Sequence, residues 1–282
     1  MKATVRIDGH AERRGRAGPI PGGGGRLARG PAPRRRHGLF GGRLARQYRR
    51  HRGLRTPRPR PDLPGYGGTD LGSDHSEAGT RNFLLSWLAE LEIDRVGLVG
   101  HSHNGRVAAQ LALEQPDRIS GLVIVGTGSM LPLVEGGREP VRTRPAVQPP
   151  PGTEPTRDHV RAAIASDLYD ESQMTPEALD IRYEMSTGPR FKARLERESA
   201  PKDRVKGQEP PIYLGLNDAP FPVLMVFGKQ DQGETVQERI ELLEQLCPNI
   251  RTCVMDRAKH LVQWDARERF NEAVGAFFSK QV

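Results

Sequence analysis

The fold is decided by Gly100-His101-Ser102-His103-Asn104-Gly105, because of the sequence on either side of it. Arg95–Val99 is a short apolar run typical of a buried strand, and it leads directly into this turn. Arg106–Glu114 follows with a helical pattern, and after a break comes a second apolar run, Leu122–Val125. Strand, tight turn, helix and strand in this order predict a βαβ unit in a parallel sheet.

The same alternation continues on both sides of a long interruption. An amphipathic helix precedes the unit, with Phe83, Leu84, Trp87, Leu88 and Leu91 at helical spacing. Residues 132–220 contain a proline-rich loop and two helical patterns, near His159–Leu168 and Thr175–Met185. Strand and helix patterns then return at 222–227, 234–246, 251–255 and 267–278. We therefore expect a core of residues 61–131 and 221–282, with residues 132–220 inserted as a helical lid.

The first 60 residues differ from the rest in composition. They hold 17 Arg and one Lys against two acidic residues, a net charge of +16, whereas the remaining 222 residues carry −8. Arg, Gly and Pro make up 35 of these 60 residues, and residues 11–60 show almost no apolar periodicity. A segment of this kind buries too little apolar surface to offset the entropy of ordering it. We predict that residues 11–60 take no cooperative part in the fold and that the sheet lacks its first strands.

Three interpretations of this basic segment stay open. It is a disordered arm that binds phosphate backbone through its arginines, a transit peptide, or a stretch of a GC-rich gene translated out of frame. Tyr48 is its only Tyr or Trp, so a stacking platform for single-stranded nucleic acid is missing. The abrupt return of ordinary protein sequence at Pro61-Asp62-Leu63 favours the misread frame.

The overall composition excludes other classes of protein. No run approaches eighteen apolar residues, so we expect no membrane-spanning helix. Two cysteines, Cys247 and Cys253, are too few for a disulfide scaffold or a multi-cysteine zinc site, and they fit a reducing, cytoplasmic compartment. His101 and His103 lack an acidic or cysteine residue nearby at metal-ligand spacing, so we expect no metal site. We also expect no organic cofactor.

A serine at a sharp turn between a strand and a helix is the setting of a nucleophile elbow. Ser102 stands in this setting, and the backbone N–H of His103 would lie at the helix N-terminus, where it can stabilise an oxyanion. Serine needs a base and an orienting acid. His260 follows the last strand and Asp231 follows the strand before it, although Asp256 is an alternative acid.

These motifs resemble those of the α/β-hydrolase family over residues 62–282. The likeness rests on the Asp62–Asp70 loop, the Gly100–Gly105 elbow, Gly228–Asp231 and His260, in the order serine, acid, histidine. The resemblance implies an α/β fold with a mostly parallel sheet, flanking helices and a helical lid. It also implies a catalytic triad of Ser102, Asp231 and His260.

Two further stretches resemble the meta-cleavage-product hydrolases, which cleave carbon–carbon bonds in 2-hydroxy-6-oxo-dienoates. His260–Asp265 with Phe270-Asn271 is similar to their histidine loop and last helix, and Leu179–Glu184 is similar to their lid helix. The resemblance implies that Arg182 faces the substrate carboxylate, with His101, Leu261 and Trp264 also at the substrate. The alternative for Arg182 is a solvated helix face.

The chain departs from this subfamily in three places. His101 and Leu261 stand where Asn and Trp are common, and Asn104 replaces a glycine. Thr4–Gly9 looks like the start of the domain, but only Gly22–Gly25 is similar to the glycine-rich oxyanion loop.

The sequence therefore predicts a serine hydrolase that acts on a small molecule and binds neither a membrane nor nucleic acid. The sequence leaves open whether the chain forms a homo-oligomer. A carboxylesterase or lactonase with the same triad is the alternative enzyme. A non-enzymatic protein tethered to nucleic acid by its basic arm is the alternative of another class.

Overall fold

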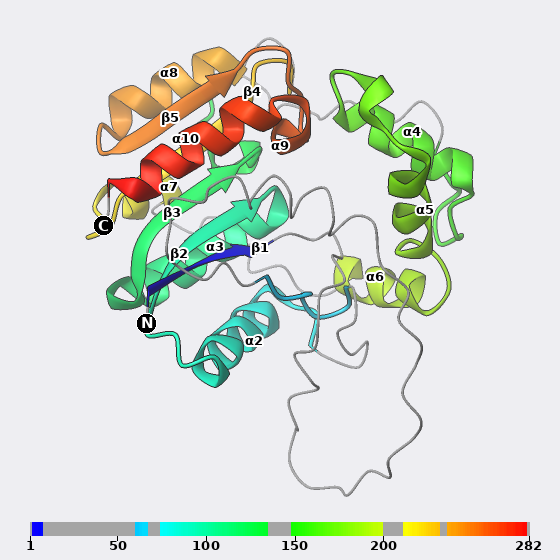
Figure 1. Cartoon of the computed structure of the whole chain (residues 1–282), viewed down its shortest axis with the longest axis horizontal. Coiled ribbons are helices and arrows are strands. Elements are labelled where there is room, and N and C mark those ends of the chain that lie inside the picture. Colours follow the sequence, from blue (N-terminus) through cyan, green and yellow to red (C-terminus); the bar gives the residue numbers. More distant parts are fainter. Residues whose placement is uncertain are drawn as a thin grey trace, which may run out of the picture.

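The computed structural model describes residues 2–7, 60–66, 74–134, 148–199, 211–231 and 236–280. Within these ranges the strands form one sheet in the order β1-β2-β3-β4-β5, and every neighbouring pair is parallel (Figure 1). The strands are β1 (Lys2–Ile7), β2 (Arg95–His101), β3 (Ile119–Val125), β4 (Val223–Gly228) and β5 (Ile250–Met255). The predicted parallel α/β sheet is thereby confirmed.

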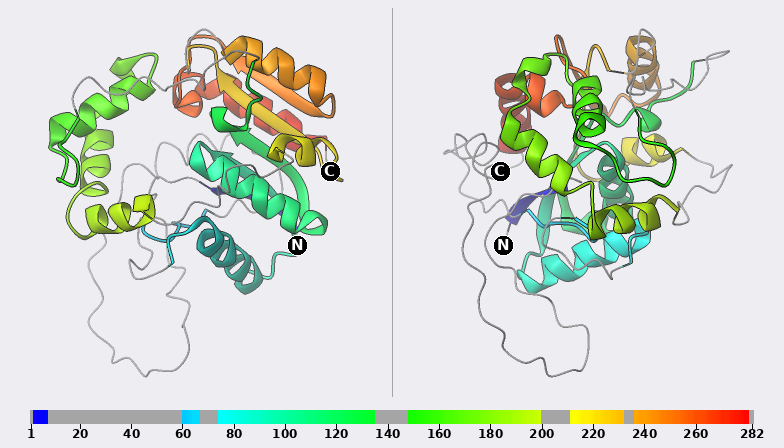
Figure 2. Two further views of the ribbon diagram at one scale, coloured as in Figure 1. Left: turned by 180° about the vertical axis from the view of Figure 1, so that it is seen from behind. Right: turned by 90° about the vertical axis from the view of Figure 1, so that its right-hand side faces the viewer.

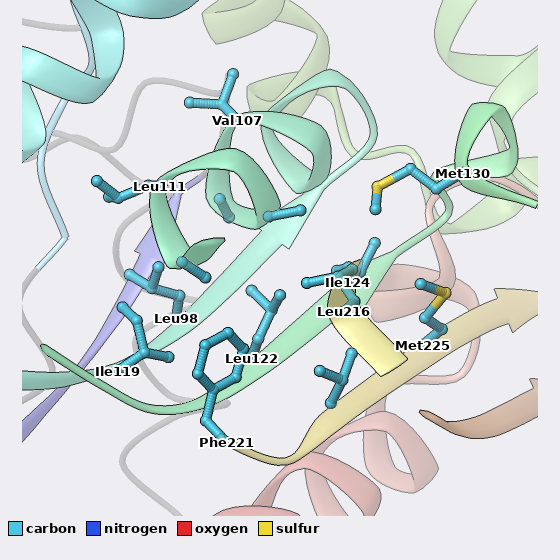
Figure 3. Close-up of a cluster of buried hydrophobic side chains, with 14 of the residues drawn as sticks. Leu98, Val107, Leu111, Ile119, Leu122, Ile124, Met130, Leu216, Phe221 and Met225 are labelled. Atoms are coloured by element: carbon cyan, nitrogen blue, oxygen red, sulfur yellow. The ribbon is translucent and has the colours of Figure 1, made fainter. Parts of the chain in front are cut away.

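The central strands bury both of their faces, which explains why their sequences are almost continuously apolar. Successive side chains point to opposite faces, so Leu98 and Val99 of β2 belong to two different hydrophobic clusters. Leu98 packs in the larger cluster with Leu122 and Met225 (Figure 3). Val99 packs in the second cluster, which includes the aromatic side chain of Phe270. Each face of the sheet therefore needs its own layer of helices.

Helices supply these two layers. The larger cluster is covered by α2 (Glu77–Glu90), α3 (His103–Glu114) and α8 (Val236–Leu246), and the second by α9 (Val262–Asp265) and α10 (Arg267–Ser279). The views of Figures 1 and 2 place α10 and α3 on opposite sides of the sheet. Short 3₁₀ turns, η1 (Pro116–Arg118) and η2 (Gly128–Met130), flank β3. Among the residues that the structure describes, no helix is long and apolar enough to cross a membrane.

A second group of helices stands to one side of the sheet (Figure 1). It consists of α4 (Arg157–Asp167), η3 (Glu171–Gln173), α5 (Pro176–Glu184) and α6 (Pro189–Ser199). The α5 helix begins as its sequence predicts, because the Thr175 side chain accepts a hydrogen bond from the Ala178 N–H and Pro176 takes the first helical position. We refer to α4–α6 as the lid.

The α7 helix (Ile212–Asn217) falls within the interval predicted as lid but packs elsewhere. Its Leu216 is buried in the larger core cluster, where the side chains of α3 also lie. The reason is its apolar sequence, which carries Ile212, Tyr213 and Leu214 against the same cluster. We therefore place α7 with the core.

The amino-terminal strand changes one expectation. Lys2–Ile7 pairs in parallel with β2, with Thr4 opposite Gly97, so the sheet does have a strand from this end of the chain. The β-branched residues Val5 and Ile7 favour such a strand. The prediction that the sheet lacks its first strands is wrong for this segment. Residues 8–59, with nearly all of the basic segment and Gly22–Gly25, lie outside the described residues.

Candidate active site

The three predicted triad residues each follow a strand. Ser102 comes directly after β2, Asp231 stands three residues after β4, and His260 lies in the loop after β5. All three strands are parallel, so these residues share the edge of the sheet at which the strands end. Ligands of open α/β sheets bind at this edge.

Ser102 has a backbone conformation that a non-glycine residue rarely adopts. Its φ of 55° and ψ of −127° make a sharp turn between β2 and α3. Such a conformation costs on the order of 1–3 kcal/mol and persists only where the surroundings hold it. The Ser102 N–H donates to the Val125 carbonyl at 2.8 Å, and the Thr127 hydroxyl donates to the Ser102 carbonyl at 2.9 Å. The turn is therefore held by the last residue of β3 and by Thr127, which lies two residues beyond that strand.

Gly100 makes this turn sterically possible. A Cβ atom at position 100 would lie 2.5 Å from the carbonyl oxygen of Asn104, which is closer than real Cβ contacts allow. The helix therefore returns across the end of its own strand only because residue 100 has no side chain. Asn104 itself is accommodated as a buried residue at this crossing.

Asp231 and His260 form a buried pair. Asp231 Oδ2 lies 3.1 Å from His260 Nδ1, and the two residues are only 4% and 5% exposed. Asp256, the alternative acid, is exposed and accepts a hydrogen bond from the Gln230 side chain at 2.9 Å. That hydrogen bond lowers the pKa of Asp256. The structure thus pairs the imidazole with Asp231.

The loop after β4 that carries Asp231 and the loop after β5 that carries His260, the histidine loop, are in direct backbone contact. A Cβ atom on Gly228 would lie 2.3 Å from the Ala258 carbonyl oxygen and 2.4 Å from that of Lys259. Gln230 then bonds to Ala258 twice, since its N–H donates to the Ala258 carbonyl and its side-chain oxygen accepts from the Ala258 N–H. These contacts fix the distance between Asp231 and His260.

His101 lies behind His260. Its ring is buried, its Nε2 is 2.8 Å from the His260 carbonyl oxygen, and the two ring centroids are 4.7 Å apart. A carbonyl oxygen only accepts hydrogen bonds, so His101 carries its proton on Nε2. The sequence predicted a contact with substrate for His101. In the structure its Nε2 contacts the backbone of the histidine loop, and the contact with substrate stays a prediction.

His103 is the first residue of α3, so its backbone N–H lies at the N-terminus of the helix, the positive end of the helix dipole. Its side chain is half exposed, with Nδ1 3.6 Å from Glu77 Oε1. The buried Glu77 carboxylate is also bound by Arg106, with Nη2 at 2.6 Å from Oε2 and Nε at 3.2 Å from Oε1. The two histidines flanking Ser102 thus contact different groups.

The predicted substrate-binding residues Leu261 and Trp264 connect the histidine loop to the lid. Leu261 is buried in a third hydrophobic cluster with Val160, Ile164, Leu168 and Leu179 of the lid, and Trp264 packs against it. Arg182 lies half-buried in the last turn of α5, one turn beyond Leu179. Arg182 therefore belongs to the lid rather than to the Asp231–His260 pair.

Sequence reasoning missed several residues that hold the site together. Thr127, Gln230 and Asp265 all bond to backbone groups of the elbow or the histidine loop. For Asp265 a signal existed, because it closes the His260–Asp265 motif. The partners of Thr127 and Gln230 lie 25 and 28 residues away, so no local pattern reveals them.

The fold and the arrangement at the carboxyl edge of its sheet define the class of α/β hydrolases. The chain belongs to the α/β-hydrolase fold family, whose model matches residues 60–267, and it is a hydrolase. The resemblance to meta-cleavage-product hydrolases is confirmed by its relatives.

Two of these relatives illustrate the likeness. A 2-hydroxy-6-oxononadienedioate/2-hydroxy-6-oxononatrienedioate hydrolase of Burkholderia vietnamiensis is 29% identical over 224 residues, covering 78% of this chain and 75% of the relative. A 2-hydroxy-6-oxo-2,4-heptadienoate hydrolase of Pseudomonas putida is 26% identical over 229 residues, covering 78% of each chain. Among solved structures, a meta-cleavage product hydrolase from Pseudomonas fluorescens has a TM-score of 0.68 at 21% identity and covers 100% of this chain and 91% of that one. At this identity the structural likeness concerns the fold.

Proposed function

We propose that this hydrolase uses Ser102 as its nucleophile and cleaves a carbon–carbon bond in a 2-hydroxy-6-oxo-dienoate. The observation that supports it most is the buried hydrogen bond between Asp231 and His260, at the sheet edge where Ser102 also lies. A carboxylate that accepts from Nδ1–H keeps the imidazole in one tautomer. Nε2 is then the nitrogen that can take a proton from a serine hydroxyl.

The proposed steps use side chains, a backbone N–H group and water. The dienol first becomes a ketone, because a carbon of the chain takes up a proton while the enol hydroxyl loses its own, and Ser102 Oγ then attacks the carbonyl carbon while His260 removes the serine proton. The backbone N–H of His103 donates to the oxyanion that forms. The bond to the neighbouring carbon breaks, its electron pair passing to the dienoate fragment, which receives the proton from His260. Water activated by His260 then hydrolyses the acyl-serine, releasing a carboxylic acid.

The substrate class is supported by the names of the relatives and by Arg182. Both relatives described above are named for 2-hydroxy-6-oxo-dienoates, which carry a carboxylate. Arg182 provides a guanidinium on the lid, and a guanidinium pairs with a carboxylate through two parallel hydrogen bonds.

Replacement of the serine tests the nucleophile. Ser102→Ala should lower hydrolysis of a simple activated ester by several orders of magnitude and leave the circular dichroism spectrum unchanged. His260→Ala should lower it nearly as much, since the two residues act as a unit. A Ser102→Ala protein that keeps more than about a tenth of the activity would refute the assignment.

Arg182 tests the bond type. With a 2-hydroxy-6-oxo-dienoate as substrate, the wild-type chain should remove its visible absorbance. Arg182→Leu should weaken kcat/KM by roughly 10- to 100-fold, as expected for loss of a charged hydrogen bond of about 1.5–3 kcal/mol. Turnover of a neutral ester should barely change.

The matched control is Arg161→Leu, which removes an exposed arginine of the lid helix α4. It should leave both activities unchanged. Equal losses on both substrates with Arg182→Leu would make that residue structural. Ester hydrolysis by the wild-type chain without any dienoate turnover would favour a carboxylesterase or lactonase. A Ser102→Ala protein that keeps both the ester and the dienoate activity would refute the serine mechanism.

A further inference from the structure

The side chain of Asp265 connects the histidine loop to the lid. One carboxylate oxygen, Oδ2, accepts from the N–H of Lys259, the residue before His260, at 2.9 Å. The same carboxylate accepts from the N–H of Tyr169 at 3.0 and 3.1 Å and from that of Asp170 at 3.3 Å. Tyr169 and Asp170 directly follow Leu168, at the end of lid helix α4. A single side chain thus bonds to both segments.

A second connection runs beside the first. The N–H of Leu261, the residue after His260, donates to the carbonyl of Asp167 at 3.0 Å. The Leu261 side chain is buried among lid residues that include Leu168, which is fully buried. Both neighbours of His260 are therefore connected to the lid. Leu261 bonds directly to Asp167, and Lys259 bonds to the Asp265 carboxylate, which also holds Tyr169 and Asp170.

We propose that Asp265 is a positioning residue that couples the seating of the lid to the orientation of His260. When Tyr169 and Asp170 are bonded to the carboxylate, Asp265 also holds Lys259, and the backbone on the amino-terminal side of His260 is fixed. When this end of the lid moves away, Asp265 loses two of its three backbone partners. The proposal rests on the proposed function and assigns a regulation to the same site.

The chemistry of the group supports this role over a purely stabilising one. Asp265 is half-buried, and burial raises its pKa, so the charged form is held at a cost in free energy. A carboxylate has only acceptor atoms and can face several N–H groups at once, whereas an amide would place its own NH₂ against one of those donors. A carboxylate is therefore well suited to accept hydrogen bonds from both segments at once.

Asp265→Asn in the full chain tests the coupling. We expect kcat for a small activated ester to fall by about 10- to 100-fold, because misplacing the base by about an ångström costs on this order. Hydrogen exchange followed by mass spectrometry should show faster exchange at Tyr169, Asp170, Lys259 and Leu261 together. Asp265→Glu should restore part of kcat, since it keeps the acceptors.

Asp256→Asn is the matched control, since it removes an exposed carboxylate close to the same loop. It should leave kcat and exchange at these four amides unchanged. A melting temperature lowered in Asp265→Asn with kcat within twofold of wild type would show a merely structural role and overturn the proposal. Faster exchange in the lid alone, without Lys259 and Leu261, would overturn it as well.

A second variant approaches the coupling from the lid. Tyr169→Pro removes one donor to Asp265 and leaves Asp265 intact, and Leu168 before it already has the extended backbone that precedes proline, with φ −106° and ψ 142°. It should lower kcat for the same small ester and speed exchange at Lys259. An unchanged kcat and unchanged Lys259 exchange would refute the coupling. A wild-type chain inactive on every ester and dienoate would instead refute the proposed function, and the exchange readout would still decide the coupling.

Discussion

The buried ring of His101 donates from Nε2 to the backbone carbonyl of His260, at 2.8 Å, and the two ring centroids are 4.7 Å apart. His101 is the last residue of β2, and the residue after it is Ser102. The residue before the strained serine thus holds the backbone of the proposed base. This contact links the β2 end of the site to the histidine loop after β5.

His101→Phe should destabilise the protein because it keeps a ring but removes the donor. A buried carbonyl left without its partner costs about 1–3 kcal/mol, which urea unfolding would measure. Ester turnover should fall several-fold as His260 loses its backbone support. His101→Gln, which keeps an N–H donor, should recover part of both. Unfolding free energies equal to wild type in His101→Phe would show that the hydrogen bond contributes nothing.

The two candidate acids are distinguished by a pair of amide variants. Asp231→Asn should lower kcat by on the order of 10³- to 10⁴-fold, since an amide stabilises the wrong tautomer of His260. Asp256→Asn should leave kcat within about twofold, because its carboxylate is exposed and bonded to Gln230. Steady-state kinetics on an activated ester checks both. The reverse ranking would assign the orienting role to Asp256.

Much of this site could be read from the sequence because its signals are local. Apolar runs that end at turn residues mark the ends of strands, and this placed Ser102, Asp231 and His260 on one edge of the sheet. The first residue of α3 was harder to predict from the sequence. The sequence predicted it at Arg106, whereas the helix begins at His103. Asn104 and Gly105 are poor helix formers, and packing across β2 overrides their propensity.

Other features depend on contacts that no local pattern encodes. Asp256 is only four residues from His260 in sequence and Asp231 is 29 residues away, yet nearness along the chain does not decide which carboxylate faces the imidazole. The packing of Gly228 against Ala258 and Lys259 decides between them by bringing the β4 loop beneath the imidazole. The bond between Asp265 and Tyr169 joins residues 96 positions apart, on the core and the lid. That residues 11–60 take no cooperative part in the fold stays a prediction, because residues 8–59 lie outside the described part of the chain.

The strained backbone of Ser102 should be visible as a gain in stability when it is relieved. Ser102→Gly removes the Cβ atom at φ 55° and should raise the free energy of unfolding by about 1 kcal/mol while abolishing activity. Ser102→Ala keeps the Cβ atom, so it should lose activity without this gain. Urea unfolding of both variants measures the difference. A Ser102→Gly protein no more stable than Ser102→Ala would show that the turn stores no strain.

The pH dependence of stability should reveal the charge held at Asp265. Burial raises its pKa above the ordinary value of 3.8, against the opposing effect of hydrogen bonds from Lys259, Tyr169 and Asp170. A carboxyl with a higher pKa in the folded chain binds more protons when folded, so its contribution to stability is present below the unfolded pKa and is lost as the pH rises through the folded pKa. Asparagine does not titrate. The unfolding free energy of wild type minus that of Asp265→Asn, measured by urea from pH 4 to pH 7, should therefore decrease with pH and then level off. A difference that increases over this range would mean that the three N–H donors outweigh burial and hold the pKa below 3.8.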